Sequence, residues 1–110
     1  NLFKCIPMKM DNFYEKFDRE AMNKPVFKYY DMHQMFQRIS CASNEDIVQI
    51  KEKLTERAKK NKEVVKLEIP NLISLKQIIN EYIKGKAINI KIVMLEEFAK
   101  QLDEIIKENS

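Results

Sequence analysis

The sequence predicts an all-α protein, a small single-domain helical bundle of about five helices that spans residues 1–110. Three observations support this fold class. The 110 residues include one glycine, whereas primed hairpin turns and nucleotide-binding loops need several. Apolar residues recur at the three- and four-residue spacing of amphipathic helices in several segments. Residues that favour helix N-termini, such as Asp and Ser, stand directly before some of these segments.

The first two expected helices hold most of the aromatic residues and methionines. Residues 12–22 follow Asp11, which is a suitable N-cap, and they end before Pro25 because the residue before a proline disfavours helical backbone. Residues 26–39 form the second expected helix. Its apolar stripe consists of Tyr29, Met32, Phe36 and Ile39.

The third expected helix begins after Ser43 and ends near Asn61 and Lys62. Ser43 and Asp46 have the spacing of a capping box, in which side chains satisfy the free N–H groups of the first turn. Its apolar stripe is narrow and consists of Ile47, Ile50, Leu54 and Ala58. Because the remaining positions are charged or polar, we expect this helix to lie at the edge of the core.

Residues 64–69 and 87–92 alternate between apolar and polar side chains, which is the period of a strand. An α+β fold with two short strands there is therefore an alternative. The all-helical fold is favoured because two parallel strands alone make a poor sheet. In it, Pro70 and Gly85 are joints between helices, and Ser74 with Gln77 caps the helix between them. The last helix has the most regular stripe, which consists of Leu95, Phe98, Ala99, Leu102, Ile105 and Ile106.

The composition of the chain shifts near residues 40–45, from aromatic and Met-rich to Ile-rich. We expect one core built from these two unlike halves rather than two domains. No apolar run approaches the length of a membrane span. Cys5 and Cys41 are too few for a disulfide framework, so the sequence predicts reduced thiols and an intracellular location, cytoplasmic or nuclear.

Catalytic and metal-binding motifs are not recognisable in the sequence. Gly85 alone cannot build a phosphate-binding loop, and His33 is the single histidine. Neither cysteine has the spacing of a zinc site. We therefore predict that the protein is not an enzyme and uses no cofactor and no metal.

The favoured function is a non-catalytic protein-interaction or regulatory module that binds a partner protein, or a second copy of itself, through a Met/aromatic-rich helical surface. A helix over residues 26–39 buries one stripe, which leaves Phe27, Tyr30 and Met35 on other faces. Met and Tyr are typical of adaptable binding surfaces. These three residues are the predicted partner-binding set.

The alternative function is a helical nucleic-acid-binding accessory domain. Residues 51–66 carry seven basic residues against three glutamates, although the net charge of the chain is only +3. The candidate phosphate-binding residues are Lys51, Lys53, Arg57, Lys59, Lys60, Lys62 and Lys66. A competing interpretation is that this basic middle meets the acidic end of the chain, residues 87–110, within the same molecule.

Overall fold

The computed structural model describes residues 17, 19–27 and 31–109, and this part of the chain is helical with no strand. The described helices are α2 (Met32–Ser40), α3 (Asn44–Lys60), α4 (Lys62–Ile83) and α5 (Ile90–Glu108). The all-α prediction is confirmed, with four helices in the described part rather than about five, and the α+β alternative is wrong. Residues 17, 19 and 20 are also helical, but most of the helix expected over 12–22 lies outside the described residues.

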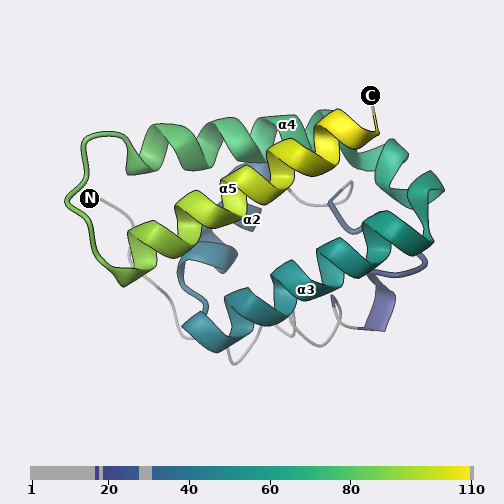
Figure 1. The fold of residues 1–110 in the computed structure, drawn as a ribbon, viewed down its shortest axis with the longest axis horizontal. Coiled ribbons are helices and arrows are strands. Elements are labelled where there is room, and N and C mark those ends of the chain that lie inside the picture. Colours follow the sequence, from purple (N-terminus) through teal and green to yellow (C-terminus); the bar gives the residue numbers. More distant parts are fainter. Residues whose placement is uncertain (1–16, 18, 28–30, 110) are drawn as a thin grey trace.

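Helix α4 is the centre of the arrangement, because it packs against α2, α3 and α5. It runs antiparallel to α3 and α5, and α5 lies between α3 and α4 in the view of Figure 1. Helix α2 lies behind α5 in that view. The connection between α4 and α5 forms one end of the long axis of the molecule.

The core contains the apolar stripes of all four helices. The stripe predicted for the last helix is buried at every one of its six positions, and Leu95, Phe98 and Leu102 are fully inaccessible to solvent. The stripe of α3 is buried as well, which confirms both of these predicted faces. Helix α3 is bounded as expected, because the Ser43 hydroxyl accepts the Asp46 N–H at 3.1 Å and the helix ends at Lys60.

Two predictions about the sequence of α4 are wrong. Pro70 is an exposed residue inside the helix, not a joint, and Ser74 is an interior residue, not an N-cap. The N–H that proline lacks would have bonded the carbonyl of Lys66, which lies on the exposed side where water can replace it. Residues on both sides of Pro70 are buried against the other helices, and this packing outweighs the local cost of the proline.

The second stretch that alternates, residues 87–92, is not a strand: residues 87–89 are a non-helical approach to α5, and residues 90–92 are its first turn. Gly85 has φ 76°, the left-handed conformation predicted for a residue that ends a helix. Asn89 then caps α5, since its side-chain oxygen accepts the Ile92 N–H at 2.9 Å. The cap explains why the helical pattern begins at Ile90.

Helix α2 begins at Met32, six residues later than the helix predicted over 26–39. The backbone of Phe27 is bonded to α4 instead of to its own helix. Its N–H donates to the Glu68 carboxylate at 3.0 Å, and its carbonyl accepts from Asn71 at 3.1 Å. These long-range bonds satisfy the polar groups of Phe27 without helix, which the sequence pattern could not indicate.

A buried ion pair joins α3 to α4 beside Phe27. Arg57 and Glu68 have side chains only 1% and 0% exposed, and they form a two-pronged contact with Arg57 Nη1 3.1 Å from Glu68 Oε2 and Nη2 bonded to Oε1. Arg57 Nη1 also donates to the Ala21 carbonyl at 3.1 Å. Burial raises the pKa of Glu68 and lowers that of Arg57, and the attraction between them opposes both shifts.

Truncating the best buried aromatic residue of α5 tests whether this helix is docked on the core. We expect Phe98→Ala to lower the free energy of unfolding by about 3–5 kcal/mol, because the ring is fully buried and its removal leaves a cavity. Chemical denaturation followed by circular dichroism measures the loss. Ile88→Ala is the matched control, since Ile88 is 75% exposed. A loss below about 0.5 kcal/mol for Phe98→Ala would contradict the packing of α5.

A double-mutant cycle tests the buried ion pair. Arg57→Met alone leaves a buried carboxylate without its ion-pair partner, and Glu68→Leu alone leaves a buried guanidinium without one. Each substitution should therefore lower the free energy of unfolding by about 3–5 kcal/mol. The double variant should be more stable than either single variant, since neither charge remains. Urea denaturation of the four proteins measures the coupling. Additive losses would show that the two side chains do not act as a pair.

Candidate functional site

Two of the three residues predicted to bind a partner are buried in this structure. Phe27 and Met35 are fully buried, and Tyr30 lies outside the described residues. The Phe27 ring packs edge-on against Phe17 at 6.1 Å and lies under the Arg57 guanidinium. Met35 belongs to the buried face of α2. The expected exposure of Phe27 and Met35 is therefore wrong, because the chain is not helical at Phe27 and α2 buries a wide face.

The basic residues of 51–66 are divided among different environments. Arg57 is buried in its ion pair, so its assignment as a phosphate contact is wrong. Lys51 pairs with Glu97 of α5 at 3.5 Å and Lys60 pairs with Glu56 at 3.0 Å. Lys53 is half-buried, and the exposed remainder consists of Lys59, Lys62 and Lys66. The Lys51–Glu97 pair is a contact between the basic middle and the acidic end of the chain, as the competing interpretation expects.

Cys41 is disulfide-bonded, so the expectation of reduced thiols is wrong for this residue. The one other cysteine of the sequence, Cys5, lies outside the described residues. Disulfides persist mainly in oxidising compartments. The intracellular location thus stays a prediction that the cysteines no longer support. Among the described residues, no helix is long and apolar enough to cross a membrane.

A groove of about 740 Å³ lies between α3 and α5. Its α3 wall consists of Val48, Lys51, Glu52, Thr55, Glu56 and Lys59. Its α5 wall consists of Glu97, Lys100, Gln101 and Glu104. These positions recur every three or four residues, so each wall is one stripe of its helix. Val48, 44% exposed, is the largest apolar side chain in the groove.

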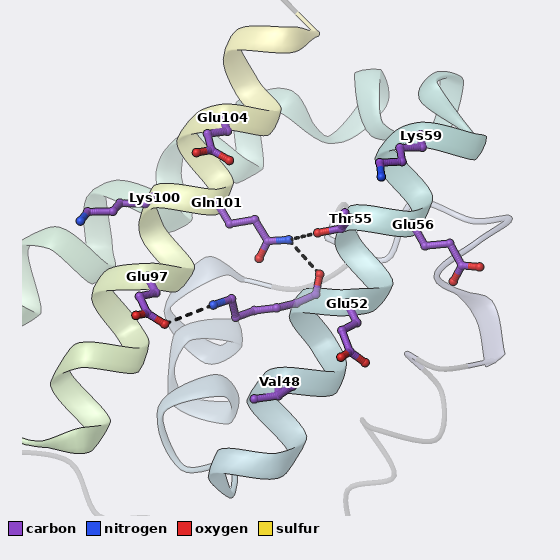
Figure 2. Close-up of a pocket in the computed structure, with 10 residues that line it drawn as sticks. Val48, Glu52, Thr55, Glu56, Lys59, Glu97, Lys100, Gln101 and Glu104 are labelled. Atoms are coloured by element: carbon purple, nitrogen blue, oxygen red, sulfur yellow. Dashed lines mark hydrogen bonds and ion pairs between the residues drawn. The ribbon is translucent and has the colours of Figure 1, made fainter.

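Gln101 ties the two walls together at the middle of the groove. Its Nε2 donates to the Lys51 carbonyl at 2.8 Å and to the Thr55 hydroxyl, and Lys51 in turn reaches across to Glu97 (Figure 2). The side-chain oxygen of Gln101 is buried and accepts no hydrogen bond from the described residues. This bridge fixes the spacing of α3 and α5, so the groove is a built feature of the fold.

Lys59 and Glu104 face each other across one end of the groove without forming an ion pair. Lys59 and Glu104 lie about two turns beyond Lys51 and Glu97, and Figure 2 shows them on opposite walls at the same end. Both are exposed, and neither has an ion-pair partner in the described part of the chain. The Lys100 side chain points away from α3, whereas Glu56 points away from α5 and pairs with Lys60. The open end is therefore basic on one wall and acidic on the other.

A second groove, of about 500 Å³, lies between α2 and α4. Its lining residues are His33, Phe36, Gln37, Ser74, Gln77, Ile78, Glu81 and Tyr82. The Phe36 and Tyr82 rings pack against each other with centroids 5.0 Å apart. His33 is exposed at the rim, and no cluster of His, Cys, Asp or Glu with the makings of a metal site occurs among the residues described. The packed Phe36 and Tyr82 rings are therefore the main structural feature of this groove.

Sequence reasoning missed the α3–α5 groove because both of its walls look like solvated helix faces. The signal available was the matched spacing of charges along the two helices, which does not reveal that the helices are neighbours. Comparison with protein-family models, with curated proteins and with solved structures found no match. Function is therefore inferred from the geometry of the chain itself.

Proposed function

We propose that this protein is a non-catalytic protein-interaction module, and that the α3–α5 groove is its binding site for a helix of a partner protein. The observation that carries the proposal is the open charge pair of Lys59 and Glu104 on facing walls. A helix in the groove places an acidic side chain against Lys59 and a basic one against Glu104. Its apolar side chains then cover Val48 and the alkyl parts of the bridge residues.

The expected interaction energies indicate that apolar contacts supply the affinity and that charges supply the specificity. An exposed ion pair contributes only about 0.2–1 kcal/mol, so Lys59 and Glu104 cannot supply most of the affinity. Opposite charges on the two walls do distinguish one orientation of a helix from the reverse one, since the reversed helix brings like charges together. Affinity comes from burial of Val48 and the neighbouring methylene groups, and specificity comes from the charge pair.

The proposal is tested by selecting helical peptides from a display library on the 110-residue chain. We expect selected peptides to carry one acidic and one basic residue at fixed spacing and to lose about tenfold in affinity against Lys59→Glu. The exchange variant, Lys59→Glu with Glu104→Lys, should select peptides in which the two charges are reversed. Isothermal titration calorimetry measures the affinities, and amide shifts of Val48, Thr55 and Gln101 locate the bound peptide.

Lys62→Glu with Glu108→Lys is the matched control, because both residues are exposed and neither lines the groove. It should leave the selected peptides and their affinities unchanged. Peptides that bind the exchange variant as well as the original chain would contradict the proposed site. So would amide shifts confined to α2.

A further inference from the structure

The connection between α4 and α5 carries two exposed isoleucines at one end of the molecule. We call residues 84–90 the α4–α5 tip; all seven are exposed, Ile88 by 75% and Ile90 by 67%. Asn89 between them is extended, with φ −149° and ψ 177°. One residue separates Ile88 from Ile90, so both exposed apolar side chains lie at this end of the molecule. Figure 1 shows this connection projecting beyond the ends of the helices.

The charged residues of the tip and of the sequence directly beside it are all lysines. Residues 82–95 contain three lysines and no acidic residue, a local charge of +3 that equals the net charge of the chain. Lys84 and Lys86 are exposed beside the isoleucines, and Lys86 Nζ lies 4.7 Å from the centroid of the Tyr82 ring. The first turn of α5 also lacks an acidic residue. The tip therefore joins exposed apolar area to an uncompensated positive charge.

Lys91 holds the tip in place instead of adding to its exposed charge. Its ammonium donates to the Ala42 carbonyl in the turn between α2 and α3. Burial lowers the pKa of Lys91, which is consistent with a side chain directed into the molecule. Together with the Asn89 cap, this bond anchors the start of α5, so Ile88 and Ile90 are presented from a fixed base.

We propose that the α4–α5 tip docks the protein on an anionic membrane surface, with Ile88 and Ile90 inserted below the headgroups and Lys84 and Lys86 among them. The connection projects beyond the helix ends (Figure 1), and residues 84–90 line neither of the two grooves described above, whereas a protein partner needs a broad matching surface. A fluid lipid surface adapts to a projecting point. The layers of the membrane also match the tip, because the anionic headgroups attract the lysines and the apolar interior below them accepts the isoleucines.

Vesicle sedimentation of the 110-residue chain tests this docking. We expect binding to phosphatidylcholine vesicles that contain about 30% phosphatidylserine at ~0.15 M salt, and little binding to phosphatidylcholine alone. Ile88→Ser with Ile90→Ser should lower the partition coefficient by at least about tenfold. Lys84→Glu with Lys86→Glu should lower it by at least about 25-fold, since one lysine near such a surface contributes about fivefold and the new glutamates are repelled.

The control variants carry the same kinds of substitution at exposed residues outside the tip. Leu67→Ser removes an isoleucine-sized side chain that is 59% exposed on α4, and Lys62→Glu with Lys66→Glu reverses two exposed lysines. Neither should change the partition coefficient by more than about twofold. Circular dichroism checks that each variant is folded. Failure of the unmodified chain to bind the anionic vesicles overturns the proposal, as does equal loss of binding in the control variants or equal binding to neutral vesicles.

Discussion

The buried Arg57–Glu68 pair is the interaction on which the arrangement of the chain depends. One carboxylate accepts from Arg57 and from the Phe27 N–H, and the same guanidinium donates to the Ala21 carbonyl. The pair thereby joins α3, α4 and the segment of residues 21–27 at one point. Taking both charges out of water is costly, and apolar residues of similar volume could give comparable stability. What an apolar pair could not supply is a partner for the free backbone groups of Ala21 and Phe27.

The position of this pair also sets where α2 begins. Because Phe27 is bonded to Glu68 and Asn71, the chain is not helical at Phe27, and α2 begins at Met32. Asn61 makes a similar side-chain hydrogen bond to the backbone of this segment, since its side chain donates to the Met22 carbonyl at 2.6 Å. Polar side chains at the corner between α3 and α4 thus do for residues 21–27 what intrahelical hydrogen bonds do elsewhere.

Local signals in the sequence predicted the helices whose ends and faces depend on neighbouring residues. The stripe of α5, the Ser43 cap and the left-handed Gly85 are of this kind, and all three are confirmed. The prediction of a helix break at Pro70 is wrong because the free-energy cost of the proline is smaller than the stabilisation from burying the helix on both sides of it. Arg57 and Glu68 could not be recognised, since each lies among other charged residues and their pairing exists only after α3 folds back on α4.

The candidate site was less predictable than the fold, for a related reason. The exposure of Phe27 was inferred from a helical wheel, and the wheel does not apply where the backbone is held by long-range hydrogen bonds. The α3–α5 groove depends on Gln101 reaching from one helix to the other, which no periodicity encodes. The α4–α5 tip had a readable signal in its three lysines without an acidic neighbour. The alternation of its isoleucines with polar residues instead suggested the strand of the α+β alternative.

The groove and the tip lie at different places on the long axis, and this separation makes the two proposals compatible. The open end of the groove, with Lys59 and Glu104, lies toward the C-terminal ends of α3 and α5, while the tip is at the opposite end of the molecule (Figure 1). A chain docked on a membrane by Ile88 and Ile90 would hold the open charge pair away from the lipid. Anionic lipid would then not compete with a partner helix for Lys59, because screening at physiological salt confines the surface potential to within about 8 Å.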